Sequence, residues 1–162
     1  MTDLLLRQLS GRAPVAVISG RSVSDLKRHL GFQPPYLIGN HGLEGLGNRP
    51  DALELARGVC ARWKAQLLSR FSGSGLRDSG AELEDKSFSI ALHYRGCTAS
   101  RGSLGRKAAK LEILKAAAAL EPRPGVLLGK CVVNLLPPGA PHKGMALVEL
   151  MRQIGIKSAF YI

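Results

Sequence analysis

The chain has 162 residues, of which 45% are hydrophobic, 5% aromatic and 22% charged, and its formal net charge is +11 at pH 7. This length and composition suit one domain, or a core with a small inserted domain, built around an aliphatic interior. No apolar run is long enough to cross a membrane and the N-terminus lacks a signal-peptide pattern, so we predict a soluble cytoplasmic protein. Cys60, Cys97 and Cys131 are widely spaced and form no CxxC pair, which indicates reduced thiols rather than disulfides or a zinc site.

The high positive charge points to an anionic partner, either a polyanion such as nucleic acid or a phosphorylated small molecule. The basic residues are spread along the chain and are not interleaved with aromatic side chains, unlike the pattern typical of nucleic-acid binding. We therefore expect no nucleic-acid partner. The opposite hypothesis, a basic nucleic-acid-binding module, predicts binding to duplex DNA that weakens steeply with salt.

The first third of the chain predicts a parallel α/β unit. Residues 3–9 are typical of the end of a helix, and the apolar run over 14–18 predicts a short buried strand. A helix is predicted over 22–31 with Ser22 as its N-cap, and a second strand over 36–40. In such strand–helix–strand units, ligands bind beyond the C-terminal ends of the strands.

The middle of the chain follows a different pattern. Helical spacing of apolar residues predicts helices over 51–71 and 103–120, and residues 72–75 (SGSG) predict a flexible connector. Strand alternation predicts two strands within 81–95 and a strand pair within 125–137. Within 81–95 it places Ile90 and Leu92 on one face and His93 on the other, polar face. The order helix, two strands, helix, two strands predicts an antiparallel sheet covered by two helices.

From residue 137 the chain returns to the first pattern. A helix is predicted over 143–154, followed by a strand over 158–162. We therefore expect an α/β protein in two parts, a partial core over residues 1–47 and 137–162 and an inserted domain over 48–136.

Two signals predict an anion site. Ser19-Gly20-Arg21 follows the first strand, where a hydroxyl, exposed backbone N–H groups and a helix N-terminus can bind an anion together. Lys143 begins the helix over 143–154, where a cation is unfavourable beside the positive end of the helix dipole unless an anion lies nearby. Taken singly, an ordinary strand-to-helix turn explains the first signal equally well, and a solvated lysine explains the second better. Both lie at the C-terminal ends of core strands, so together they favour one shared site.

The turn over residues 39–44 is a third candidate, because it follows the second strand. It contains Asn40, His41, Gly42 and Glu44. The alternative is a purely structural turn, in which asparagine and glycine accept positive φ and His41 bonds locally. No other histidine and no cysteine has ligand spacing to His41, so we predict no metal site from these residues.

Taken together, four segments of the chain resemble trehalose-6-phosphate phosphatases of the haloacid dehalogenase superfamily: VAVISGRSVSDL, YLIGNHGLE, ELEDKSFSIALHYR and GKCVVNLLPPGAPHKGMAL. They cover nearly the whole chain in order. The resemblance implies an incomplete Rossmann-like core with an inserted α/β cap of two helices on an antiparallel sheet. It also implies hydrolysis of trehalose 6-phosphate through an aspartyl-phosphate, a step of trehalose biosynthesis.

The resemblance implies roles for individual residues. Ser19 would bind the transferred phosphoryl group, and Lys143 would neutralise the phosphate and the aspartyl nucleophile. Other residues would border this phosphate site: Gly20, Arg21, Asn40, His41, Gly42 and Glu44. The cap would contact the sugar through Glu84, Lys86, Lys130 and Asn134. The family often has Glu at the position of Asn134 and Arg at that of Leu136, so a phosphatase of another sugar phosphate is the alternative.

The acidic motifs of the family are absent from this sequence. The family's nucleophile lies in a DxDGT motif and its Mg²⁺ ligands extend to a GDDxTDE motif, whereas the five aspartates here form neither DxD nor DD. We therefore interpret the chain as an internal fragment, expect it to be inactive alone, and expect Mg²⁺ only in the complete enzyme. A non-catalytic phosphosugar-binding remnant is the other hypothesis. The expected partner is a small-molecule sugar phosphate, without nucleic acid or membrane, and the oligomeric state is left open.

Overall fold

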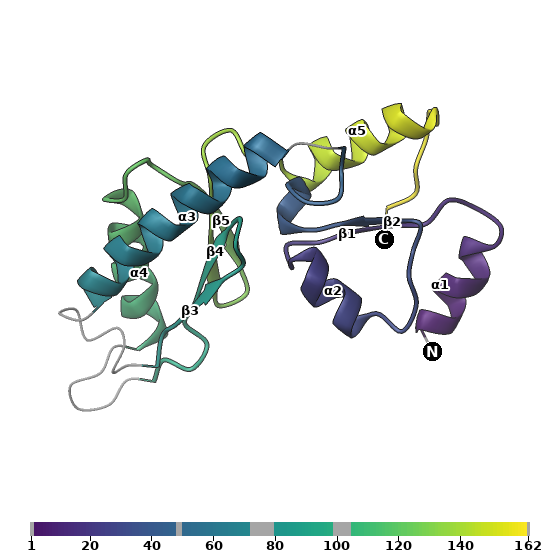
Figure 1. Cartoon of the computed structure of the whole chain (residues 1–162). Coiled ribbons are helices and arrows are strands. Elements are labelled where there is room, and N and C mark those ends of the chain that lie inside the picture. Colours follow the sequence, from purple (N-terminus) through teal and green to yellow (C-terminus); the bar gives the residue numbers. More distant parts are fainter. Residues whose placement is uncertain (1, 48–49, 72–79, 99–104, 162) are drawn as a thin grey trace. The chain divides into compact units, whose positions relative to one another are not determined.

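The computed structural model of the chain describes residues 2–47, 50–71, 80–98 and 105–161 (Figure 1). The chain divides into two compact units, unit 1 (Met1–Pro50 with Ala140–Ile162) and unit 2 (Asp51–Gly139). Each unit has its own cluster of buried hydrophobic side chains. The predicted connector over 72–75 lies outside the described residues.

Unit 1 contains two parallel strands joined by a helix, which confirms the predicted strand–helix–strand order. The strands pair in register, with Ile18 opposite Ile38. Ser22 caps the connecting helix, because its Oγ accepts a hydrogen bond from the backbone N–H of Asp25 at 3.1 Å. The elements of unit 1 are α1 (Thr2–Ser10), β1 (Ala16–Ile18), α2 (Val23–His29), β2 (Tyr36–Ile38), the 3-10 helix η1 (Asn40–Gly42) and α5 (Lys143–Ile154).

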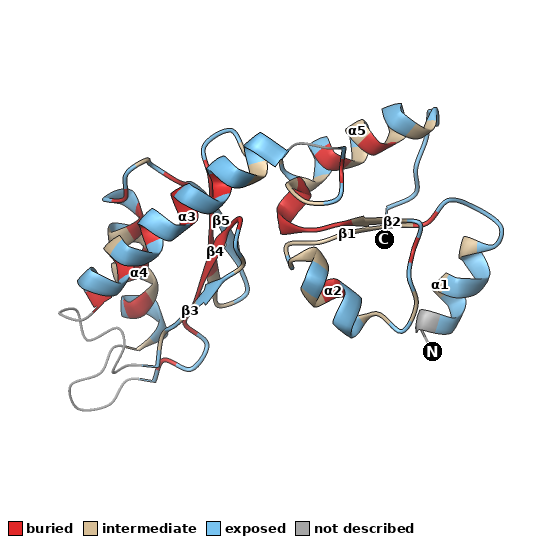
Figure 2. Cartoon of the chain, viewed as in Figure 1, coloured by how far each residue is buried: buried red, intermediate tan, exposed pale blue. Residues whose placement is uncertain are grey.

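The core of unit 1 lies between its strands and α5. Ala146 and Leu150, one helical turn apart on α5, are buried in one cluster with Ile38 of β2 and Leu46 (Figure 2). The helix predicted over 143–154 begins and ends at exactly those residues. This packing holds the start of α5 against the segment that follows β2.

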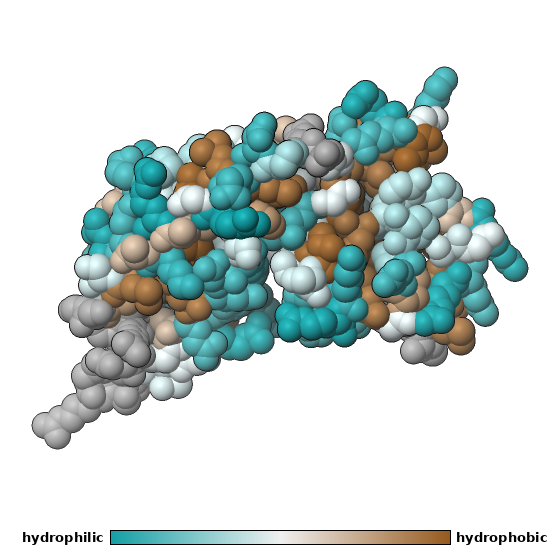
Figure 3. Space-filling view, viewed as in Figure 1, coloured by the Kyte–Doolittle hydropathy of each residue, from teal (hydrophilic) through white to brown (hydrophobic). Residues whose placement is uncertain are grey.

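The strand predicted over 158–162 is wrong for the residues that the structure describes. Residues 157–161 form no strand, and Phe160 and Tyr161 are 96% and 66% exposed. A strand needs a hydrogen-bonded neighbour, and no described residue pairs with this segment. Large hydrophobic side chains reach the surface elsewhere too, as the brown patches of Figure 3 show. Leu4 and Leu5 of α1 are 61% and 59% exposed.

Unit 2 is an antiparallel sheet with two helices, which confirms the predicted order helix, two strands, helix, two strands. The sheet order is β3-β4-β6-β5. β3 and β4 form one antiparallel hairpin, β5 and β6 form another, and the pairing of β4 with β6 joins the two hairpins. The helix predicted over 103–120 spans only Arg106–Ala118 in the structure, and residues 103 and 104 lie outside the described part. The elements of unit 2 are α3 (Pro50–Phe71), β3 (Glu82–Asp85), β4 (Ile90–His93), α4 (Arg106–Ala118), β5 (Gly125–Gly129) and β6 (Val132–Leu136).

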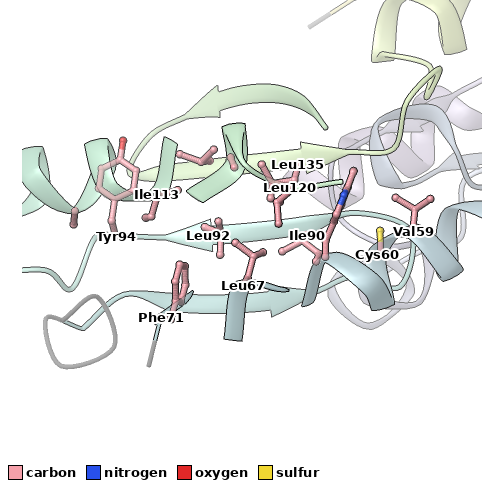
Figure 4. Close-up of a cluster of buried hydrophobic side chains, with 14 of the residues drawn as sticks. Val59, Cys60, Leu67, Phe71, Ile90, Leu92, Tyr94, Ile113, Leu120 and Leu135 are labelled. Atoms are coloured by element: carbon pink, nitrogen blue, oxygen red, sulfur yellow. The ribbon is translucent and has the colours of Figure 1, made fainter. Parts of the chain in front are cut away.

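One face of this sheet packs against the helices. Ile90 and Leu92 of β4 point to the same side as Leu135 of β6, and they meet Leu67 of α3 and Ile113 of α4 in the core (Figure 4). The alternation of a strand therefore places the side chains of intervening residues on the opposite face. That opposite face carries Glu84 and Asn134, two of the polar residues of unit 2 that the sequence singled out.

Burial also sets the chemistry of Cys60, which is 1% exposed in this core. Burial, followed by the nearby charge of Asp85, raises the pKa of the Cys60 thiol from 9.0 to about 12. An unfolded chain ionises this thiol at lower pH than the folded chain does. The free energy of unfolding therefore falls as pH rises above about 9, and this loss continues until the folded-state pKa is reached.

We expect the substitution Cys60→Ala to remove this contribution to the alkaline pH dependence. Between pH 8 and pH 10.5 the free energy of unfolding should fall by about 2 kcal/mol less in the variant than in the wild type. Urea unfolding at both pH values measures the two slopes. Cys131→Ala, at a half-buried thiol, is the control, and equal slopes in wild type and Cys60→Ala would contradict the prediction.

Candidate active site

The loops after β1 and β2 lie together at the C-terminal edge of the two strands (Figure 1). The backbone N–H of Ser19 donates to the carbonyl of Ile38 at 2.9 Å, and the N–H of His41 donates to the carbonyl of Ser19 at 2.9 Å. The N–H of Asn40 donates to the carbonyl of Arg21 at 2.8 Å. The structure thus brings together Ser19-Gly20-Arg21 and Asn40-His41-Gly42, which lie 21 positions apart in the sequence.

Close packing explains two glycines of this edge. A Cβ atom on Gly20 would lie 2.5 Å from Cε1 of His41, whose side chain is buried. Gly42 has φ +117°, and a Cβ there would lie 2.9 Å from the Cβ of Ala146 on α5. The turn is therefore in direct contact with Ser19-Gly20 on one side and with the first residues of α5 on the other.

The start of α5 is capped from within, and its first residue is Lys143. His142 is the N-cap, and its Nδ1 accepts hydrogen bonds from the N–H groups of Gly144 at 3.1 Å and Met145 at 3.3 Å. Among the described residues Lys143 has no ion pair or side-chain hydrogen bond, and no acidic residue occupies the first turn of α5. Its ammonium group is therefore available to an anion, and the helix dipole favours negative charge there, although two N–H groups of the first turn already donate to His142.

Two other predicted binding residues have partners within the protein. The guanidinium of Arg21 donates to Oδ2 of Asp25 at 2.6 Å. This hydrogen bond is the main reason why the pKa of Asp25 lies below its ordinary value, and the charges of His29 and Arg28 lower it further. Arg21 must therefore exchange this partner if it is to contact a ligand.

Glu44 holds the loops together. Its Oε2 accepts the backbone N–H of Val23 at 2.9 Å and the side-chain N–H of Asn40 at 2.6 Å. A carboxylate at this place satisfies a free N–H group of the first turn of α2 and complements its dipole. Asn40 and Glu44 therefore have the structural role that the sequence analysis gave as the alternative for this turn. A substrate contact by Glu44 stays a prediction.

We expect Glu44→Ala to lower the free energy of opening of the α2 N-terminus by about 2 kcal/mol, because two N–H donors lose one shared acceptor. Hydrogen exchange at the amide of Val23 measures this opening. Glu54→Ala, at a carboxylate that is 74% exposed, is the control and should leave the exchange of Val23 unchanged. Unchanged exchange in Glu44→Ala as well would show that this carboxylate does not hold the loops.

In unit 2, three of the four predicted sugar contacts gather at the sheet face opposite the helices. The register places Glu84, Ala91 and Asn134 side by side on β3, β4 and β6. Nζ of Lys86, in the turn after β3, lies 3.7 Å from Oε2 of Glu84 and 3.5 Å from Oδ1 of Asn134. The structure therefore brings three of the four predicted residues into one polar cluster.

Lys130 is the predicted residue that stays outside this cluster. It lies exposed between β5 and β6, with no hydrogen bond or ion pair to any described residue. His93 is the residue that the sequence reasoning missed, since its Nε2 lies 2.9 Å from Oε2 of Glu84. Strand alternation placed His93 on the polar face, but only the register of β3 with β4 identifies its partner.

A metal site is not formed by the described residues, which contain no group of three or more His, Cys, Asp or Glu side chains able to hold an ion. None of the helices in the described ranges is long and apolar enough to span a membrane.

Comparison with known sequences identifies relatives of the whole chain. The family described as trehalose-phosphatase matches residues 2–162. A trehalose-phosphate phosphatase of Mycobacterium tuberculosis is 30% identical over 151 residues, which are 90% of this chain and 36% of that protein. Another M. tuberculosis protein, named as an uncharacterized glycosyl hydrolase, is 34% identical over 156 residues, 93% of this chain and 11% of that protein. The chain therefore spans well under two thirds of these curated relatives.

Solved structures share the fold. The crystal structure of a trehalose-6-phosphate phosphatase related protein superimposes with a TM-score of 0.67 at 20% identity, covering 93% of this chain and 62% of that one. The C-terminal domain of a Candida albicans trehalose-6-phosphate phosphatase does so with a TM-score of 0.57 at 17% identity, covering 92% and 51%. The predicted α/β fold class is thereby confirmed.

Proposed function

Because the chain belongs to the trehalose-phosphatase family of the haloacid dehalogenase superfamily, we propose that it is part of an enzyme that hydrolyses trehalose 6-phosphate. The observation that carries this proposal is the family match over residues 2–162. The contacts of Gly42 with α5 and of His41 with Ser19 support it, because they group the residues implied to bind phosphate.

In this proposal unit 1 binds the phosphoryl group. The Ser19 hydroxyl donates a hydrogen bond to a phosphoryl oxygen, and Lys143 supplies positive charge at the start of α5. The unfavourable position of a cation at a helix N-terminus is then compensated by the anion that both of them bind. Stabilising the charge of the transferring phosphoryl group is the main contribution that proteins make to this reaction.

The nucleophile and the metal are proposed for the complete enzyme. The resemblance places an aspartyl nucleophile in a DxDGT motif, which this sequence does not contain. Mg²⁺ does not fit the residues present, since the described part of the chain offers no cluster of ligands for it. We therefore assign no metal-dependent step to these residues and expect no phosphate release by this chain alone.

Unit 2 is proposed as the cap, and its polar sheet face as the sugar site. The carboxylate of Glu84 would accept hydrogen bonds from sugar hydroxyls, while Lys86 and the amide of Asn134 would donate or share them. The family often has a glutamate at the position of Asn134. The asparagine amide can still form hydrogen bonds with a sugar, but it lacks the negative charge of the glutamate. Another sugar phosphate is therefore the alternative substrate.

Titration calorimetry of the chain with trehalose 6-phosphate tests the binding part of the proposal. We expect binding that Lys143→Ala weakens about tenfold or more, since a charge-assisted hydrogen bond contributes about 1.5–3 kcal/mol. Lys157→Ala, at an exposed lysine of the same unit, is the control and should bind like the wild type. Absence of heat with the wild-type chain would overturn the proposed function.

Reading the encoding DNA on both sides of this frame tests the catalytic part. Continuation into DxDGT on one side and GDDxTDE on the other would supply the proposed nucleophile and metal ligands, and Mg²⁺-dependent phosphate release by the longer protein should follow. Stop codons at both ends would contradict catalysis and leave phosphosugar binding as the function.

A further inference from the structure

We propose that His93 is a positioning residue that holds the Glu84 carboxylate ready for a sugar hydroxyl; this inference rests on the proposed function of the same site. His93 does not itself need to touch the sugar. Its role is to hold Oε2 of Glu84 by a hydrogen bond within the protein, so that Oε1 is left to accept a hydrogen bond from the ligand.

The contacts of Glu84 are distributed unevenly between its two oxygens. Nε2 of His93 lies 2.9 Å from Oε2, and Nζ of Lys86 lies 3.7 Å from the same atom. Among the described residues none forms a hydrogen bond or ion pair with Oε1, and the Glu84 side chain is 48% exposed. One hydrogen bond from His93 and the nearby charge of Lys86 therefore hold Oε2, while the other oxygen keeps its acceptor capacity for a hydroxyl group.

The hydrogen of the His93–Glu84 contact must come from the histidine. A carboxylate only accepts hydrogen bonds, so Nε2 of His93 carries the hydrogen and donates it. The register places His93 directly opposite Glu82, so its contact with Glu84 runs diagonally between β4 and β3. A diagonal contact is set by the side chains themselves and is lost when the donor is removed.

The remaining members of the cluster give it rigidity. Lys86, whose side chain is 11% exposed, also approaches Oδ1 of Asn134 at 3.5 Å, and Nδ2 of Asn134 donates to the carbonyl of Leu127 at 3.3 Å. Polar contacts thus run across all four strands of the sheet, from His93 to β5. A carboxylate held in this way loses less freedom when a sugar binds, which favours affinity.

The test measures binding of two probes, trehalose 6-phosphate and inorganic phosphate, to the full chain by titration calorimetry. We expect His93→Ala to weaken trehalose 6-phosphate binding about tenfold, the effect of a lost charge-assisted hydrogen bond, and to leave phosphate binding unchanged. His93→Gln keeps an N–H donor and should remain within about twofold of the wild type. Arg95→Ala removes a neighbouring cation without a contact to Glu84 and is the control.

The outcomes separate this inference from the proposed function. If the wild type binds trehalose 6-phosphate and His93→Ala binds it equally well, the inference is overturned and the function stands. If His93→Gln is as weak as His93→Ala, donation by His93 is not the cause and the inference is again overturned. Absence of sugar-phosphate binding by the wild type overturns the function itself.

A second measurement does not need a ligand. The imidazole N–H signal of His93 in a ¹H–¹⁵N spectrum should shift in Glu84→Gln and stay in place in Glu112→Gln, a carboxylate on α4 that pairs with Lys115. An unshifted His93 signal in Glu84→Gln would show that the contact is absent in solution, which overturns the inference whatever binds.

Discussion

Replacing Gly42 by alanine is expected to lower the free energy of unfolding of unit 1 by roughly 3 kcal/mol. Two causes add. The φ of +117° is one that residues with a Cβ rarely adopt, and the new Cβ would lie 2.9 Å from Ala146 and 3.4 Å from the carbonyl of His142. Relief of that contact requires the turn to move away from the start of α5.

The same movement should weaken phosphate binding, because the turn contacts Ser19 through the backbone N–H of His41 and contacts α5 through Gly42. Hydrogen exchange of the α5 amides measures stability, and calorimetry with inorganic phosphate measures the site. Gly155→Ala is the matched control, since Gly155 has φ +70° but no atom within 4 Å of a built Cβ, so only backbone strain of about 1 kcal/mol applies. Equal effects of the two substitutions would show that packing against α5 contributes nothing.

Replacing Trp63 by alanine is expected to cost unit 2 about 4 kcal/mol of unfolding free energy. The side chain is 0% exposed in the core between α3 and the sheet, so its removal leaves a large cavity. Its Nε1 also donates to the carbonyl of Pro122 at 2.7 Å, and alanine leaves that carbonyl without this donor. A domain of this size has little stability to spare, so we expect partial unfolding at room temperature.

Urea unfolding followed by circular dichroism measures this loss in the variant and in the wild type. Leu55→Ala on the same helix is the control, because Leu55 is 71% exposed and its truncation should change the free energy by less than about 0.5 kcal/mol. Trp63→Phe separates the two causes, since it restores most of the volume but not the donor. A Trp63→Ala variant as stable as the control would mean that this core is not closed around the indole in solution.

The candidate phosphate site was accessible to sequence reasoning because its residues follow strands. Ser19 and His41 each come directly after a predicted strand, and parallel strands bring such positions to one edge. Lys143 was conspicuous because its charge opposes the helix dipole. What the sequence did not reveal is that Arg21 and Glu44 are already engaged, by Asp25 and by Val23 with Asn40.

Local order in this protein was determined by the sequence itself. The helix over 143–154 and the cap formed by Ser22 depend on contacts between residues about four positions apart or fewer. Such contacts can be predicted directly from the spacing of apolar residues and from the residue type at the cap. The same holds for the alternation that put Ile90 and Leu92 on one face of β4 and His93 on the other.

Pairing between distant segments was decided only by the tertiary structure. Residues 158–161 carry a strand-like sequence but form no strand, because backbone hydrogen bonds of a strand depend on a neighbour that local sequence does not specify. The contact of His93 with Glu84 likewise depends on the register of β3 with β4, and a shift of one residue would turn Glu84 to the opposite face.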